Sequence, residues 1–263
     1  MKPGVVFPNQ MAPTLADAGA LVEAGAQSLV ALPGAFVDES FNLTASPDDI
    51  ATVCGQMELA AVMMAEPLQN EGDSSAGVAH LQSCIDLADA LRDYFSQDAL
   101  PLVVCDVGPY ASGQKSEALK AGVAALQQVA PHAEERQVVI GVKPDRNSAV
   151  DRARGAANLL GEVGSSYVQI ALDAAGTVGD KDALDDAVGR LKDNIVIAFA
   201  RDVKFDADGT ATYPPPGNGV LQYPTYVALL SDAPGCNHLV VGDQSSPEEL
   251  KVALAKVSGF VKA

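Results

Sequence analysis

Tryptophan is absent from the 263 residues, and all aromatic residues together make up only 5% of the chain. A carbohydrate site built on tryptophan platforms is therefore excluded. Basic residues are also scarce, because 17 lysines and arginines stand against 34 aspartates and glutamates, for a formal net charge of −17. A chain of this charge repels nucleic-acid phosphates, so we expect no nucleic-acid partner. The acidic composition suits either a salty cytoplasm or an ordinary acidic enzyme, and both interpretations remain open.

Cysteine is limited to four widely spaced residues, Cys54, Cys84, Cys105 and Cys236, with no CxxC pair and no metal-ligand spacing. Reduced thiols in a cytoplasm are the simpler interpretation. Apolar runs long enough to span a membrane are also lacking. The opening "MKPGVVFPNQ" has no apolar region of the kind found in a signal peptide. We therefore predict a cytoplasmic protein with no membrane segment and no processed leader.

Short apolar runs rich in valine and isoleucine alternate eight times with amphipathic stretches. Hydrophobic residues amount to 48% of the chain, enough for a sizeable core. Near-continuous hydrophobicity in short runs is typical of strands that are covered on both faces. The predicted strands occupy 4–7, 28–32, 60–65, 101–107, 137–143, 167–173, 194–200 and 238–243.

Helical patterns with recognisable starts lie between these runs. One begins at Thr14 and ends near Gly25, and another has Ser46 as its N-cap and Pro47 at its first helical position. Eight βα units in this length predict an α/β fold, a (β/α)8 TIM barrel, as one domain over 1–263. A doubly wound sheet usually carries a glycine-rich turn after its first strand, and "VVFPNQMAPT" has none. The barrel is therefore favoured.

Reacting groups of such barrels lie at the carboxyl ends of the strands and in the loops that follow. The three histidines, His80, His132 and His238, fall on predicted helices or at the start of the last strand, so we expect no histidine-based centre. The polar residues that the strand assignments place at the carboxyl ends are Asn9, Gln10, Glu66, Asp106, Tyr110, Lys143, Asp173, Arg201, Asp202, Asp243 and Gln244.

Four stretches in the second half carry a family resemblance. They are "VIGVKPDRN", "LDAAGTVGD", "FARD" and "YPPPGNGVLQYPTYVALL". Together they resemble the strand-five, strand-six and strand-seven motifs and the following loop of the xylose-isomerase-like TIM barrel family, which holds sugar isomerases and 3-epimerases. The motifs cover roughly 137–245, and the order of elements fits over the whole chain. The resemblance implies a TIM barrel acting as a sugar phosphate isomerase or epimerase.

The resemblance also implies one divalent cation, Mg²⁺ or Mn²⁺, that stabilises an enediolate oxygen. Its usual ligand positions correspond here to Lys143, Asp173, Phe199 and Gly242. Only Asp173 is a metal-ligand type, and strand alternation would point Asp243 to the wrong face. We therefore predict that the usual metal site is degenerate and that no metal or other cofactor is firmly bound, unless an atypical site survives.

The surviving residues admit several roles. Lys143 and Asp173 are the predicted catalytic residues, with Lys143 as fixed positive charge, as a Schiff-base lysine or only as a structural partner of Asp173. Arg201 is expected to bind a substrate phosphate or carboxylate, or else to pair with Asp202 or Asp173. Further candidate substrate-binding residues are Asp202, Asp106, Gly217 and Gly219, although the two glycines also suit an ordinary rigid turn.

Three functions therefore remain open. The first is an isomerase or epimerase that acts on a small polyhydroxy carbonyl compound, a sugar or sugar-like acid. The second is a metal-independent lyase or aldolase that uses Lys143. The third is a non-catalytic descendant that binds a metabolite. A homodimer is expected by the resemblance alone.

Overall fold

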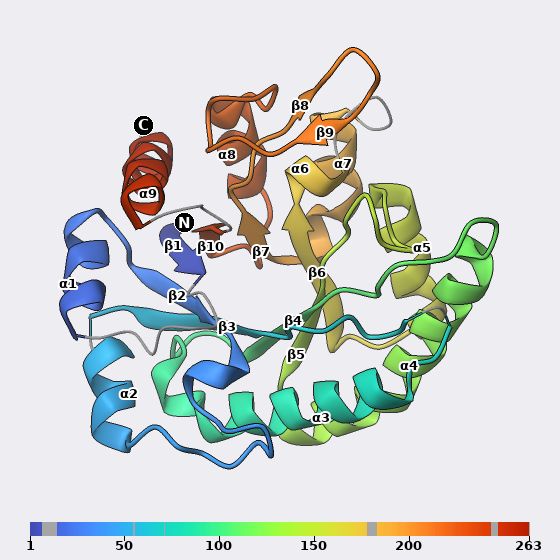
Figure 1. The fold of residues 1–263 in the computed structure, drawn as a ribbon, viewed down its shortest axis with the longest axis horizontal. Helices are drawn as coiled ribbons and strands as arrows, with labels where there is room; N and C mark the ends of the chain where they lie inside the picture. The colour runs from blue at the N-terminus through green and yellow to red at the C-terminus, as the bar shows by residue number, and fades with distance from the viewer. Residues whose placement is uncertain (7–14, 55, 71, 178–182, 243–246, 263) are drawn as a thin grey trace.

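A closed barrel of eight parallel strands forms the centre of the molecule (Figure 1). The computed structural model describes residues 1–6, 15–54, 56–70, 72–177, 183–242 and 247–262. Around the barrel the strands follow the order β1-β10-β7-β6-β5-β4-β3-β2. Their bounds are β1 Lys2–Val6, β2 Ser28–Ala31, β3 Glu58–Met63, β4 Leu102–Cys105, β5 Val139–Val142, β6 Val168–Asp173, β7 Ile195–Phe199 and β10 His238–Val241. Every predicted strand is present, and the TIM barrel fold is confirmed.

Helices cover the outside of the barrel and alternate with its strands along the chain (Figure 1). The described helices are α1 Leu15–Glu23, α2 Pro47–Cys54, α3 Ser75–Ala90, α4 Lys115–Arg136, α5 Ala153–Val163, α6 Ala174–Thr177, α7 Leu184–Leu191, α8 Tyr223–Ser231 and α9 Pro247–Lys262. Short 3-10 turns lie at Pro33–Ala35, Arg92–Tyr94 and Lys192–Asn194. Thr14, the predicted start of the first helix, lies outside the described residues.

The start of α2 shows how local sequence fixes a helix end. Ser46 Oγ accepts a hydrogen bond from the Asp49 backbone N–H at 3.1 Å, and Asp49 Oδ2 accepts one from the Ser46 N–H at 3.3 Å. This reciprocal pair satisfies two backbone donors that the first helical turn leaves free. Pro47 follows at the first helical position, where the lack of an N–H costs nothing. The predicted N-cap is confirmed.

The core consists of aliphatic side chains from both faces of the barrel strands and from the inner faces of the helices. Ile140, Ile170 and Ile197 are fully buried on neighbouring strands. Burial on both faces explains why these strands are almost continuously hydrophobic in the sequence. All four cysteines are unpaired. None of the described helices is long and apolar enough to cross a membrane.

The loops after β3, β4 and β5 are joined to one another at the carboxyl end of the barrel. Gln69 is the centre of this junction: its Nε2 donates to the Pro109 carbonyl at 2.7 Å, and its Oε1 accepts from the Gly72 N–H at 2.7 Å. The Ala149 N–H then donates to the Gly108 carbonyl at 2.8 Å. Gly108 has a φ of +110°, and a Cβ there would lie 2.2 Å from the Gln69 carbonyl oxygen. Only glycine fits this junction.

A small two-stranded hairpin stands beyond the carboxyl end of β6 (Figure 1). Its strands are β8 (Lys204–Phe205) and β9 (Ala211–Thr212), which pair in antiparallel register. The hairpin belongs to the long connection between β7 and α8, for which the sequence patterns predicted no strands. It lies at the end of the barrel where reacting groups of this fold are found.

Candidate functional site

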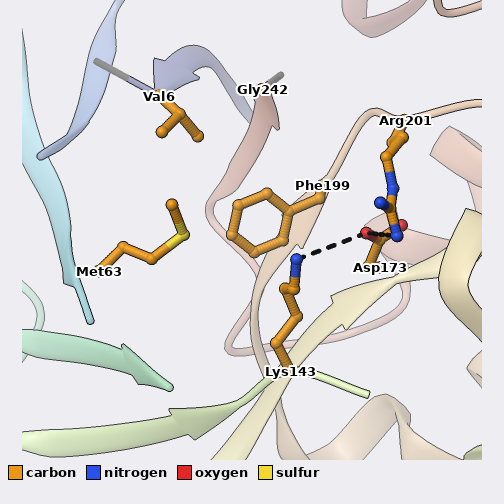
Figure 2. A pocket seen from close by; sticks show the side chains of 7 residues that line it. All are labelled: Val6, Met63, Lys143, Asp173, Phe199, Arg201 and Gly242. Atoms are coloured by element: carbon orange, nitrogen blue, oxygen red, sulfur yellow. Dashed lines mark ion pairs between the residues drawn. The ribbon is translucent and has the colours of Figure 1, made fainter. Parts of the chain in front are cut away.

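One pocket at the carboxyl end of the barrel is lined by residues at the ends of six strands or within two positions after them. Figure 2 shows Lys143, Asp173 and Arg201 pointing toward one another beside the ring of Phe199. The complete lining consists of Val6, Met63, Lys143, Asp173, Phe199, Arg201 and Gly242. All four positions that the family resemblance assigns to metal ligands therefore lie in the same pocket.

Asp173 is the last residue of β6 and the anionic centre of the pocket. Its side chain is only 2% exposed. Its carboxylate oxygen Oδ2 lies 2.8 Å from Arg201 Nη2 and 3.9 Å from Lys143 Nζ (Figure 2). The other oxygen, Oδ1, accepts a hydrogen bond from the Gly176 N–H at 3.3 Å, in the short helix α6 that begins directly after the strand. A buried carboxylate needs such partners to remain charged.

Lys143 directly follows β5 and extends into the pocket. Its backbone N–H donates to the Cys105 carbonyl at 2.8 Å, which continues the pairing of β5 with β4 by one residue. The ammonium lies 5.5 Å from the centroid of the Phe199 ring, within the range of a cation–π interaction. A fixed positive charge therefore stands in the pocket beside the carboxylate of Asp173.

Arg201 joins the pocket to the loop after β5 and to the hairpin. Its Nη2 lies 2.6 Å from Asp145 Oδ2, in addition to its contact with Asp173. The Tyr213 ring stacks on the guanidinium, with 4.1 Å from Cζ to the ring centroid. Burial by itself would raise the pKa of Asp145, but the guanidinium of Arg201 outweighs it and lowers that pKa. Of the two predicted partners of Arg201, the structure contains Asp173.

Asp202 is fully buried, and its carboxylate is surrounded by backbone N–H groups of the connection between β7 and α8. Its carboxylate accepts hydrogen bonds from the N–H groups of Val203 at 2.8 Å, Gly217 at 3.0 Å, Gly219 at 2.7 Å and Leu221 at 3.1 Å. Backbone amides arranged in this way form an anion-binding concavity. Here the anion is supplied by the chain itself. Contact of Asp202, Gly217 or Gly219 with a substrate stays a prediction.

Asp106 follows β4 and faces the joined loops. Its Oδ1 accepts a hydrogen bond from the Gly108 N–H at 2.9 Å. Burial raises its pKa, although the Ser148 hydroxyl, the Gly108 N–H and the Lys143 ammonium act in the opposite direction. Asp106 is therefore coupled electrostatically to Lys143, and its contact with a substrate stays a prediction.

The remaining candidates lie apart from this pocket or outside the described residues. Glu66 is exposed, because β3 ends at Met63 and not at the predicted residue 65. Tyr110 is covered by Lys115, whose Nζ lies 5.6 Å from the ring centroid. His80 and His132 are in α3 and α4, and His238 begins β10 at the opposite end of the barrel. Asn9, Gln10, Asp243 and Gln244 fall outside the described residues.

Sequence reasoning missed four residues at this site. Val6 and Met63 line the pocket, but they are neither polar residues nor positions of the family's metal ligands, the two criteria by which candidates were chosen. Asp145 is two residues after Lys143, at the same carboxyl end of the barrel as Arg201. This position in the sequence could have indicated a second carboxylate near that arginine. Tyr213 gave no local signal, because its position on Arg201 depends on how the hairpin folds.

Among the described residues, the side chains of the pocket do not match the donor set that a divalent cation prefers. Mg²⁺ and Mn²⁺ prefer several oxygen ligands, and the phenyl ring of Phe199 and the backbone position of Gly242 provide no side-chain donor. Lys143 brings a positive charge, and Asp173 is already paired with Arg201. Within the described ranges, no group of three or more His, Cys, Asp or Glu side chains is arranged to hold a metal ion.

Comparison with known proteins identifies the family. The family model for the xylose isomerase-like TIM barrel matches residues 20–256. The chain therefore belongs to the xylose isomerase-like TIM barrel family, as the resemblance implied. No curated protein matches the chain in sequence.

Solved structures of the same fold include epimerases and metal-containing proteins. D-psicose 3-epimerase with D-tagatose from Clostridium cellulolyticum H10 is 14% identical, with a TM-score of 0.75 over 100% of this chain and 98% of that one. The probable 3-DHS dehydratase AsbF from Bacillus anthracis is 13% identical, with a TM-score of 0.73 over 100% and 99%. A xylose isomerase-like TIM barrel protein from Mycobacterium smegmatis in complex with magnesium is 10% identical, with a TM-score of 0.67 over 94% and 87%. At these identities the likeness shows the fold alone.

Proposed function

We propose that this chain is an isomerase or epimerase of a small polyhydroxy carbonyl compound, in which the ammonium of Lys143 takes the place of a divalent cation. One observation carries the proposal. The four positions that the resemblance assigns to metal ligands line a single pocket, and Lys143 Nζ lies there 3.9 Å from Asp173 Oδ2. A lysine at this point supplies the positive charge that proton transfer beside a carbonyl needs.

The proposed reaction begins with removal of a proton from the carbon next to the carbonyl by the carboxylate of Asp173. The electrons of that C–H bond form a carbon–carbon double bond, and the carbonyl oxygen becomes an enediolate oxygen that the Lys143 ammonium stabilises. Asp173 then delivers the proton to the former carbonyl carbon while the hydroxyl proton passes between the two enediol oxygens, which gives the isomer. A proton from water delivered to the opposite face of the original carbon gives the epimer, and Asp173 then loses its own proton to solvent. No net oxidation or reduction takes place, and Arg201 holds Asp173 in place at 2.8 Å.

The contacts around the pocket favour an uncharged substrate over its phosphate ester. The amide concavity of Gly217, Gly219 and Leu221 is filled by the carboxylate of Asp202. Arg201 Nη2 is engaged by both Asp145 and Asp173. A phosphate group would compete with these two carboxylates for the same guanidinium, and the chain as a whole is strongly acidic. We therefore place a free sugar ahead of a sugar phosphate or a sugar acid.

A lyase that uses Lys143 is the second candidate, and one feature favours it. The Lys143 side chain is only 20% exposed, and shielding from water is one way in which proteins prepare a lysine nucleophile. Reduction with borohydride in the presence of a ketose separates the two. A covalent adduct on Lys143 would support the lyase, whereas proton exchange without an adduct supports the isomerase.

The proposed function is tested by hydrogen exchange. D-Fructose and other free ketoses are incubated in D₂O with chelator-treated protein, and NMR follows the C–H signals next to the carbonyl. We expect enzyme-dependent loss of these signals without added metal. Exchange that begins only when Mg²⁺ or Mn²⁺ is supplied would contradict the role of Lys143. No exchange with any ketose under either condition would contradict the enzyme and favour a non-catalytic metabolite-binding protein.

A further inference from the structure

The connection between β7 and α8 is fixed at its base by a buried carboxylate. Asp202 accepts backbone hydrogen bonds from both sides of the connection, including Val203 at its start and Gly219 near its end. The Val220 N–H also donates to the Val203 carbonyl at 2.9 Å. A Cβ on Gly219 would lie 2.2 Å from Asp202 Oδ1, so a larger residue cannot stand there without moving the carboxylate. The two ends of the connection that contains the hairpin are therefore held together by hydrogen bonds.

Two aromatic side chains of the hairpin region rest on arginines of the barrel loops. The Phe205 ring lies 4.7 Å from Arg146 Cζ, and the Tyr213 ring lies 4.1 Å from Arg201 Cζ. Only the second arginine belongs to the pocket, because Arg201 also contacts Asp173. Tyr213 is thus separated from the carboxylate of Asp173 by a single side chain, that of Arg201, which contacts both residues.

Tyr213 retains a large exposed surface at this point. It is 38% exposed, and the other large apolar side chains that are exposed in the described part of the chain are all aliphatic. Burial raises the pKa of its phenol, the guanidinium of Arg201 opposes this, and Asp145 and Asp173 raise it further. Tyr213 is therefore electrostatically linked to the pocket carboxylates, and its hydroxyl stays neutral at ordinary pH. A half-covered tyrosine of this kind offers an apolar ring and a polar tip.

We infer that Tyr213 contacts the part of the substrate that extends beyond the reacting carbons and sets the length of sugar that the site accepts. The inference rests on the proposed function. Carbons held between Lys143 and Asp173 react, and the carbons farther along the chain pass Arg201 and meet Tyr213. A four-carbon ketose ends before this contact, whereas a six-carbon ketose makes it. Tyr213 is thus a specificity-determining residue rather than an acid or base.

The experiment compares exchange of D-fructose and L-erythrulose by wild type, Tyr213→Ala and Tyr213→Phe. We expect Tyr213→Ala to lower kcat/KM for D-fructose about tenfold or more, through a higher KM. The kcat/KM for L-erythrulose should stay within about twofold of the wild-type value. Tyr213→Phe should retain most of the preference, because it keeps the ring. Phe205→Ala is the matched control, because the Phe205 ring stacks on Arg146 outside the pocket. This variant should leave the ratio of kcat/KM for the two ketoses unchanged.

Equal losses for both ketoses would overturn the inference, because Tyr213 would then act only by holding Arg201. Unchanged kinetics would overturn it as well. A second measurement does not depend on turnover. The chain has no tryptophan, so Tyr213→Trp creates a single reporter, and we expect its emission to change saturably with D-fructose but not with L-erythrulose. Wild-type protein that exchanges no ketose would refute the proposed function. Emission of the Tyr213→Trp variant that does not respond to D-fructose would refute the contact separately.

Discussion

Arg201 and Asp173 form an ion pair of 2.8 Å in the pocket, and Arg201 simultaneously contacts Asp145 at 2.6 Å. One guanidinium nitrogen is therefore shared by two carboxylates, one at the end of β6 and one in the loop after β5. Asp173 also faces Lys143 in the pocket, whereas Asp145 accepts a backbone hydrogen bond from Asn147 in its own loop. The two carboxylates bind the same arginine, but only Asp173 lines the pocket in which the proposed reaction takes place.

Asp173→Asn is expected to lower the exchange rate by about 10²–10⁴-fold, because it removes the general base. Asp145→Asn is the matched variant, since it removes the other carboxylate on Arg201 and leaves the base. We expect it to cost about tenfold at most, through looser positioning of Arg201. NMR exchange in D₂O measures both rates. Equal losses in the two variants would show that Asp173 only positions Arg201.

Lys143→Met and Lys143→Arg separate charge from nucleophilicity at this position. If the ammonium stabilises the enediolate, Lys143→Met should lower kcat by about 10²–10³-fold, as removal of one electrostatic stabiliser does. Lys143→Arg keeps the charge and should retain part of the activity. A Schiff-base enzyme would lose all activity in both variants, so residual turnover by Lys143→Arg decides between the two roles.

Asp202→Asn is expected to destabilise the fold by about 2–4 kcal/mol, because an amide presents only one acceptor oxygen to four backbone donors and adds two donors of its own. The free energy of unfolding in urea measures the effect. Asp206→Asn in the exposed turn of the hairpin removes the same charge and should change that free energy by less than about 0.5 kcal/mol. Similar losses would mean that net charge, and not the amide concavity, matters.

Gly219→Ala and Gly189→Ala are expected to change stability in opposite directions. A Cβ at Gly219 would lie 2.2 Å from Asp202 Oδ1, so the substitution should cost more than about 2 kcal/mol and weaken the hairpin base. Gly189 is in α7, and a methyl group there would meet no atom within 4 Å, so alanine should stabilise the helix by about 0.5–1 kcal/mol. Thermal unfolding of the two variants checks both signs.

His238 is expected to make the protein sensitive to mild acid. Burial lowers its pKa from 6.5 to about 4, although Glu58, whose Oε1 lies 3.4 Å from His238 Nε2, acts in the opposite direction. Lys2 and the amino terminus lower it further. The unfolded chain therefore binds a proton below about pH 6.5 that the folded chain refuses until about pH 4, and stability falls as pH decreases through this window.

The measurement is the urea midpoint of wild type and His238→Gln at about pH 7 and about pH 5. The loss attributable to this group is at most on the order of 3 kcal/mol across the whole window, and His238→Gln should remove most of it. His132→Gln, at a surface ion pair with Asp86, should leave the acid sensitivity in place. An unchanged pH dependence in His238→Gln would assign the sensitivity to other groups.

A cytoplasmic location, a homodimer and the assignment of 1–263 to one domain remain predictions, as do the roles of Asp106, Asp202, Gly217 and Gly219 in binding a substrate. A degenerate metal site is likewise a prediction, and elemental analysis of the purified protein after equilibration with divalent cations tests it.

The sequence by itself determined the barrel and the residues at its carboxyl end. Hydrophobic runs such as 137–143 and 194–200 must be covered on both faces, and their alternation with helices leaves few arrangements other than a closed parallel barrel. The order of strands then brings Lys143, Asp173 and Arg201 to one end, because parallel strands end on the same side. Their motifs also sufficed to identify the family.

Only the tertiary structure decided how these side chains pair. Whether Arg201 meets Asp173, Asp202 or Asp145 depends on rotamers and on the path of loops that are distant in sequence, and local patterns contain no such information. Asp202 does not line the pocket, and four backbone N–H groups of its own connection between β7 and α8 hold its carboxylate. Tyr213 reaches Arg201 from a hairpin whose two ends are joined by the hydrogen bonds of that same carboxylate. Long-range hydrogen bonds and stacking, rather than sequence spacing, therefore define the candidate site.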